Sequence, residues 1–290
     1  MNLPTRFAHG VATNPWTLLI STIGSILGLG VLINDRFFVP TPTTEPIALF
    51  LLVTVIYVAV SGAALRILDD NRKLREVANN FREINSIYRD RLFSAFHGEN
   101  PVKERAKLID IEKITLTSVC QRISQIYSKL TGRNCVVTVK LLTKENDNVF
   151  VTTYARSEND SERDKASPKR FEVNTGQNTA FDEALMPNTT GHISHFYSGD
   201  LRKHKHYNNQ RPSWDKCYQS TIVVPIRCLG VEGKSTREDI GFLCIDTKSR
   251  NRLNNSHHVV MMAALADQMY NFMSLMRGKY TVSVEGVDAK

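Results

Sequence analysis

The sequence predicts an α+β protein with a helical membrane hairpin, a linker helix and one antiparallel-sheet domain. Three observations predict this arrangement. The chain of 290 residues begins with two uncharged apolar segments, Trp16–Ile33 and Ile47–Leu65. A charged stretch without Gly or Pro then begins at Leu68, and four strand-like runs follow between two long helical patterns. We therefore divide the chain into a two-span region at 1–67, a coiled-coil-like linker helix at 68–100, a domain at 101–278 and a tail at 279–290.

Both apolar segments fit membrane spans. Each is long enough, as a helix rising about 1.5 Å per residue, to cross a hydrocarbon core of about 30 Å. The loop Asn34–Pro46 carries one Arg, whereas several basic residues follow the second segment: Arg66, Arg72, Lys73 and Arg75. The positive-inside rule then places both termini in the cytoplasm, so we expect a multi-pass protein of the inner membrane. The alternative for the first segment is a cleaved signal peptide, but the run is too long and lacks a small-x-small site.

The charged stretch carries a narrow apolar stripe. Its members recur at alternating spacings of three and four residues, as in a heptad repeat: Leu74, Val77, Phe81, Ile84 and Tyr88. A helix of this kind buries its stripe against a second copy of the chain or against its own domain. We favour a parallel dimer, which makes the chain a homo-oligomer.

The domain has the element order helix, strand, strand, long crossing, strand, strand, helix. The helices are expected at Lys103–Thr131 and His257–Met276, and the strands at Cys135–Thr143, Val149–Tyr154, Ser220–Arg227 and Ile240–Thr247. Within the crossing, Ser157–Lys169 is expected to be a mobile loop, and Thr175–Leu185 a short helix capped by Asn174 or Thr175. This order predicts one antiparallel sheet with both long helices on one face. The crossing then covers the other face, where a ligand can sit.

Composition and motifs argue against several classes of protein. The five cysteines are odd in number, lack C-x-x-C spacing and lie on the reducing side, so disulfides and thiolate zinc are not expected. Four histidines, His192, His195, His204 and His206, have no Cys or carboxylate at ligand spacing, so we expect no metal. Neither a G-x-S-x-G motif nor a P-loop occurs, and we expect no enzyme, no cofactor and no nucleic-acid polymer as partner.

The final third of the chain resembles the GAF domain. The segment Val224-Pro225-Ile226 matches its hydrophobic-Val-Pro-hydrophobic strand, Gly241-Phe242-Leu243 its Gly-hydrophobic-Leu strand, and Leu265-Ala266-Asp267-Gln268 its Leu-Ala-x-Gln helix. The resemblance implies a GAF-like sensor fold whose ligand pocket is roofed by the middle section. The Asn-Lys-Phe-Asp-Glu motif of cyclic-nucleotide GAF domains is not matched at its spacing. Some GAF proteins reduce free methionine sulfoxide, but the cysteine spacing around Cys217 does not match their pattern.

A basic stretch with two aromatic residues lies in this middle section. Lys and Arg can hold a phosphate, while Tyr and Trp can stack on a base. Together with an Asp at a strand end, the candidate ligand-binding residues are Arg202, Lys203, Lys205, Tyr207, Arg211, Trp214 and Asp246. The alternatives for the basic stretch are a solvated loop and a patch that contacts anionic lipid headgroups.

These observations predict a membrane-anchored sensor that binds a small anionic ligand, expected to be a nucleotide. Binding would signal through paired linker helices to the spans or to a partner, because no output module follows Arg277. Two alternatives stay open. One is an effector of the bacterial antiviral type, in which a nucleotide second messenger triggers assembly and disruption of the bilayer. The other is a non-catalytic scaffold that binds protein.

Overall fold

The computed structural model describes residues 44–97, 104–146, 148–157, 170–186, 194–211, 214–228 and 238–285. The chain divides into two compact units, residues 1–76 and residues 77–290. The first predicted membrane span lies outside the described residues, as does 158–169, most of the predicted mobile loop.

Helix α3 (Thr44–His97) contains both the second apolar segment and the charged stretch. It is one continuous α-helix, which confirms that the linker helix continues from that segment. Ion pairs one helical turn apart, Lys73 with Asp69 and Arg72 with Glu76, lie on its surface. Over the described ranges, no helix combines enough length with enough apolarity to cross a membrane.

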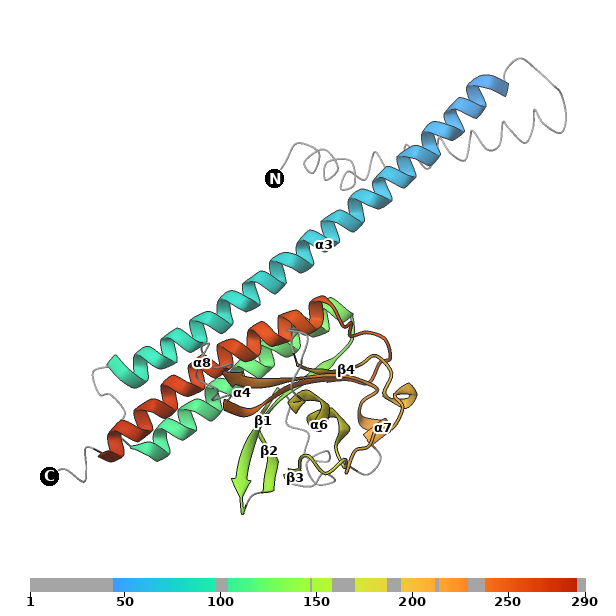
Figure 1. Ribbon diagram of the computed structural model, residues 1–290. Helices are drawn as coiled ribbons and strands as arrows, with labels where there is room; N and C mark the ends of the chain where they lie inside the picture. The colour runs from blue at the N-terminus through green and yellow to red at the C-terminus, as the bar shows by residue number, and fades with distance from the viewer. Residues whose placement is uncertain are drawn as a thin grey trace, which may run out of the picture. The chain divides into compact units, whose positions relative to one another are not determined.

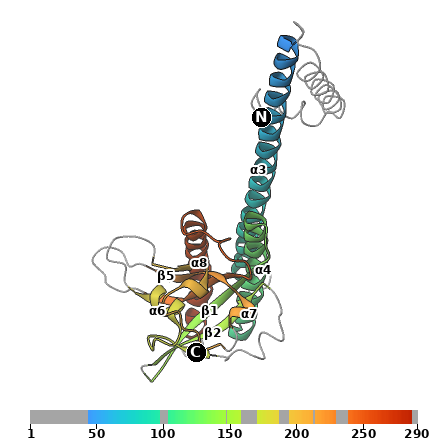
Figure 2. The ribbon, with the colours of Figure 1, turned by 90° about the vertical axis from the view of Figure 1, so that its right-hand side faces the viewer.

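Among the described residues, the second unit contains one six-stranded sheet in which all neighbouring strands are antiparallel (Figures 1 and 2). The strands are β1 (Cys135–Glu145), β2 (Asn148–Arg156), β3 (Arg170–Glu172), β4 (Phe196–Ser198), β5 (Ser220–Cys228) and β6 (Glu238–Thr247). Their order is β3-β2-β1-β6-β5-β4, so the first and last strands of the chain meet at the centre. The four long strands confirm the prediction, whereas the short edge strands β3 and β4 were not predicted.

Two long helices cover one face of this sheet (Figure 1). Helices α4 (Arg105–Thr131) and α8 (His257–Glu285) pack on each other, α4 also on β1 and β2, and α8 also on β5 and β6. The middle section contains α6 (Thr179–Leu185), the 3-10 turn η1 (Leu201–Lys203) and α7 (Trp214–Cys217). Buried side chains form two cores, one under the long helices and one under the middle section. This arrangement of two covered faces confirms the prediction.

Helix α6 begins later than the sequence suggested. Its N-cap residue is Asn178, which corrects the expected cap at Asn174 or Thr175. The preceding loop is held by the carboxylate of Asp182, which accepts hydrogen bonds from the backbone N–H groups of Asn174 (2.7 Å) and Gly176 (3.0 Å). A side chain from within the helix thus satisfies donors of the loop, where Asn174 and Gly176 have the left-handed φ values of 63° and 71° that no α-helix contains.

The apolar stripe of the linker packs into the domain of its own chain. Ile84 is fully buried and Tyr88 nearly so, and both belong to the core that α4 and α8 form. The ring centroids of Tyr88 and Phe272 lie 4.9 Å apart, and Arg122 pairs with Glu83 at 2.9 Å. These contacts correct the expectation that a second copy covers this part of the stripe. The alternative, packing against the domain, is the one observed.

Three residues show how local chemistry shapes the sheet. Gly132 has a left-handed φ of 65° and ends α4, so that the chain turns into β1. Pro225 lies in β5 beyond the residues that pair with β4, where its missing N–H leaves no gap in that pairing. Gly241 pairs with Leu141 at the centre of the sheet, where a Cβ would collide with the carbonyl oxygen of Lys140. The close spacing of the two central strands therefore requires glycine there.

Candidate functional site

Alternation along the strands divides their side chains between the two cores. On β1, Val137 belongs to the core under the long helices, whereas its neighbour Thr138 lines the opposite face. Thr138 pairs with Arg156 on β2 and with Cys244 on β6, and Cys244 pairs in turn with Val223 on β5. One row of four side chains therefore crosses the sheet under the middle section.

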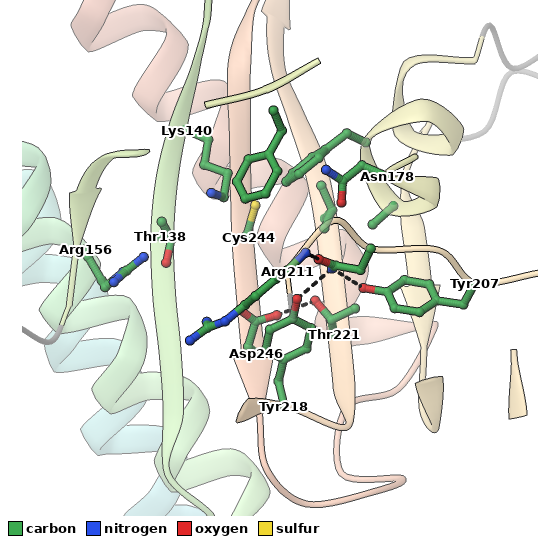
Figure 3. A pocket seen from close by; sticks show the side chains of 15 residues that line it. Thr138, Lys140, Arg156, Asn178, Tyr207, Arg211, Tyr218, Thr221, Cys244 and Asp246 are labelled. Atoms are coloured by element: carbon green, nitrogen blue, oxygen red, sulfur yellow. Dashed lines mark hydrogen bonds between the residues drawn. The ribbon is translucent and has the colours of Figure 1, made fainter. Parts of the chain in front are cut away.

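A small pocket of about 60 Å³ lies between this row and the middle section (Figure 3). Strands β1, β2, β5 and β6 form its floor, and α6 with the loop after η1 forms its roof. The polar and charged side chains of its lining are Thr138, Lys140, Arg156, Asn178, Tyr207, Asn209, Arg211, Tyr218, Thr221 and Asp246. The pocket therefore lies on the face of the sheet where the sequence predicted a ligand.

Two segments of the roof are bonded to each other. The backbone N–H of Thr179 donates to the carbonyl oxygen of Asn208 (3.2 Å), and the backbone N–H of Asn208 donates to Oγ1 of Thr179 (2.8 Å). Beside them, Asn178 and Asn209 form an isolated antiparallel bridge. These bonds fix the start of α6 relative to the loop after η1.

Asn209 orients two tyrosine hydroxyls at the pocket. Its side-chain oxygen accepts a hydrogen bond from the backbone N–H of Arg211 (2.9 Å), which determines which end of the amide is nitrogen. That nitrogen donates to the hydroxyl oxygens of Tyr207 (2.9 Å) and Tyr218 (2.6 Å). Burial raises the pKa of Tyr207 well above its ordinary value, so this hydroxyl keeps its proton at neutral pH.

The charged residues of the lining are mainly basic. The lining contains Lys140, Arg156 and Arg211 but one carboxylate, that of Asp246, so three positive charges minus one negative charge leave +2. The hydroxyl of Thr221 donates to Oδ1 of Asp246 at 2.6 Å. A partly enclosed cavity with this balance of charge attracts anions.

Three of the seven predicted ligand-binding residues line the pocket: Tyr207, Arg211 and Asp246. The other four do not. Arg202, Lys203 and Lys205 are exposed, and Arg202 pairs with Asp215 at 3.1 Å. Trp214 packs edge-on against Tyr207, with ring centroids 4.8 Å apart. The basic stretch is therefore divided between the pocket and the solvent.

The other polar lining residues were not among the candidates. Thr138 and Thr221 lie within strands, and their only signal was a polar residue alternating with apolar ones. Asn178, Asn209 and Tyr218 lie in irregular segments, and no spacing in the sequence connects them. Their convergence comes from the folding of the crossing over the sheet.

Cysteines and histidines form no metal cluster within the described residues. The five cysteines, all of which lie in the described ranges, form no disulfide, and burial raises the pKa of the Cys120 and Cys135 thiols. Among the four histidines considered from the sequence, His195 hydrogen-bonds to Asn255 at 2.8 Å, and the His204 ring lies 5.1 Å from that of Phe196. His192 lies outside the described residues.

No protein-family model and no curated protein sequence matches this chain. Solved structures similar to it include a type II free methionine-R-sulfoxide reductase from Thermoplasma acidophilum, at 19% identity over 57% of this chain and 94% of that chain, with a TM-score of 0.40. The GAF domain of an Acinetobacter phosphoenolpyruvate-protein phosphotransferase is similar at 14% identity, over 73% and 96% of the two chains, with a TM-score of 0.40. A far-red-absorbing dark state with bound biliverdin is similar at 15% identity, over 60% and 99%, with a TM-score of 0.34. The strand order and the two cores described above are those of an α+β fold.

Proposed function

We propose that residues 77–290 form a sensor domain that binds a small anionic ligand in the pocket between the sheet and the middle section. The observation that carries this proposal is the charge of the pocket, where Lys140, Arg156 and Arg211 outnumber Asp246. Cations in a partly enclosed site attract an anion more strongly than the same cations in water. The surrounding amides and hydroxyls supply hydrogen bonds that orient the ligand.

The proposed role is binding without chemical change of the ligand. Because burial raises the pKa of Tyr207, its hydroxyl serves as a hydrogen-bond donor and not as a base. Recovery of the ligand in unchanged form after long incubation with the protein tests this role. Conversion of the ligand, lost when a lining residue is replaced, would contradict it.

The size of the pocket bears on the nucleotide expected from the sequence. A volume of about 60 Å³ is below the roughly 300–1,000 Å³ that is common for sites holding drug-sized ligands. A nucleotide would enter only if the middle section moved outward, whereas a small anion needs no such movement. A nucleotide and a small anion thus share the negative charge that the pocket favours, and the nucleotide is the larger of the two candidates.

The signal is proposed to reach α3 through the sheet. Strands β1, β5 and β6 line the pocket with one face and pack against the long helices with the other. The second half of α3 packs on that same core through Ile84 and Tyr88. A ligand that shifts these strands would therefore change the packing of α3. The side chain of Leu74 on α3 is exposed and is the part of the stripe that a second chain would contact.

Attachment to a membrane is proposed from the sequence segments at 16–33 and 47–65. Between positions 53 and 67 of α3, six of the large apolar side chains that the structure describes are exposed: Val53, Val55, Val58, Val60, Leu65 and Ile67. Exposed apolar residues gathered on one element are typical of a surface that contacts lipid or protein. Retention of the full chain in the membrane fraction after alkaline washing, and its release on deletion of residues 1–67, would support attachment. Recovery of the full chain in the soluble fraction would contradict it.

Thermal unfolding of the full-length protein tests the proposed ligand class. Inorganic phosphate, sulfate, acetate and adenine nucleotides are compared with uncharged glycerol at equal ionic strength. An anion at about 100 times its Kd should add about 2.7 kcal/mol to the free energy of unfolding and raise the Tm. Arg211→Gln should weaken this effect, whereas Lys205→Gln removes the same charge from an exposed position and should not. If no anion raises the Tm, the proposal is wrong.

A further inference from the structure

Asn178 occupies the N-cap position of α6 without using its side chain as a cap. Asparagine at this position ordinarily accepts a hydrogen bond from a backbone N–H two or three residues further on. Asn178 makes no such side-chain bond. Its backbone carbonyl oxygen accepts from the N–H groups of Phe181 and Asp182, both at 3.1 Å, as is usual at an N-cap. The helix therefore starts correctly without the side chain, which is left for another role.

The side chain of Asn178 is directed into the pocket (Figure 3). The residue is 1% exposed, and its amide nitrogen has no hydrogen-bond partner among the described residues. Buried polar groups are almost always satisfied by the protein, by water or by a ligand. The nitrogen is a donor, so the group that completes it is an acceptor from outside the chain.

The neighbouring groups of the roof also act as donors. Asn209 directs its amide hydrogens at the hydroxyl oxygens of Tyr207 and Tyr218. Each hydroxyl keeps one hydrogen of its own to donate. Both hydroxyls can therefore donate as well as accept. Together with the guanidinium of Arg211, the roof matches a ligand that is both an acceptor and negatively charged.

We propose that the pocket is a receptor for a compact oxyanion, and that Asn178 donates a hydrogen bond by which the oxyanion is recognised. The proposal rests on the proposed function and narrows it to a carboxylate, sulfate or phosphate ligand of few heavy atoms. A cavity of about 60 Å³ suits a ligand of this size better than a drug-sized molecule. Asp246 would repel such an anion, but the hydrogen bond from Thr221 offsets part of its charge. The three positive charges of the lining exceed the negative charge that remains on Asp246.

The test measures the affinity of the full-length protein for inorganic phosphate, sulfate and acetate from the rise of Tm with concentration. Asn178→Asp replaces the donor with a carboxylate and should weaken binding at least tenfold. Asn85→Asp makes the same change of charge at an exposed position of α3 and should leave the affinity unchanged. Asn178→Ala removes the donor without adding charge, and should also weaken binding. This second variant keeps the test valid if Asn178→Asp does not fold.

The outcomes separate this inference from the proposed function. Stabilisation by a compact oxyanion that is lost in both Asn178 variants supports the inference, whichever of phosphate or acetate binds more tightly. Stabilisation by nucleotides but by none of the compact anions overturns the inference and leaves the proposed function standing. Compact anions that bind the Asn178 variants as tightly as the original chain overturn the role of Asn178. Failure of every anion, large or small, would overturn both.

Discussion

The two faces of the sheet are built from the same strands and each carries an apolar core, but only one of them also carries the polar pocket. On the face under α4 and α8, Val137 and Ile222 are fully buried among apolar neighbours. On the other face, their neighbours Thr138 and Thr221 are almost as well buried but lie beside charged residues of the pocket. Burying polar groups costs free energy unless they are hydrogen-bonded. The helix face is therefore almost wholly apolar, whereas the pocket face combines apolar burial with polar groups held in place beside it.

Gly241→Ala should have the largest effect, because Gly241 lies where both faces depend on the spacing of two strands. Its Cβ would collide with the backbone of Lys140, which cannot move as a side-chain end can. We expect a loss of roughly 3 kcal/mol or more in the free energy of unfolding, measured by urea denaturation. Gly278→Ala is the matched control, since nothing lies near a Cβ there, and it should stabilise α8 by about 0.5–1 kcal/mol. A small cost at Gly241 would show that the strands can separate without loss.

Ile84→Ala perturbs the helix face alone. Ile84 is fully buried, so its truncation should cost about 2–5 kcal/mol and leave the affinity for anions unchanged. Leu74→Ala, at a position of the same stripe that is 61% exposed, should change stability by no more than about 0.5 kcal/mol. A cost at Leu74 as large as at Ile84, and dependent on protein concentration, would show that a second chain covers the stripe there.

Exchanging neighbours on β1 tests the division between the faces directly. Val137→Thr places a hydroxyl in the apolar core and should cost about 1–3 kcal/mol. Thr138→Val removes a hydroxyl from the pocket face, and should change stability by less than about 1 kcal/mol while weakening anion binding. Chemical denaturation and ligand-dependent Tm measure the two effects. Equal costs of unfolding for the two exchanges would refute the division.

The smallest expected effect is a loss of stability in acid that comes from His258. Burial, and secondarily the charge of His257, lowers the pKa of this imidazole below its ordinary 6.5. Its Nδ1 accepts a hydrogen bond from the backbone N–H of Asn254 (3.1 Å), which requires the neutral ring. The contribution of neutral His258 to the free energy of unfolding is therefore complete above about pH 6.5. It is lost as the pH falls through the lower pKa of the folded state.

Urea denaturation between about pH 8 and pH 5 measures this loss. His258→Gln should flatten the decline relative to the original chain, and His257→Gln, at an exposed position, should leave most of it. A decline that is identical in both variants would assign the acid sensitivity to other groups.

The sequence by itself determined the order of the elements, the antiparallel sheet and the covering of its two faces. Periodicity carries this information, because alternate residues of a strand lie on the same face of a sheet. Residues three or four positions apart likewise lie on the same face of a helix. The sequence also identified Tyr207 and Arg211 in the basic stretch and Asp246 at a strand end, and all three line the pocket. The partner that the sequence favoured for the linker stripe, a second copy of the chain, was wrong for Ile84 and Tyr88, because amphipathic spacing shows that a face is buried and does not show against what.

Only the tertiary structure decided which side chains meet. The bridge between Asn178 and Asn209 joins segments about thirty residues apart in the sequence, and neither segment has a regular pattern. Likewise, Arg156 reaches the pocket because the register places it opposite Thr138, and one residue of slip would have turned it to the helices. Local sequence sets the conformation of each segment, but contacts between distant segments depend on the packing of the whole chain. For that reason the donors of the pocket appear together only in the folded protein.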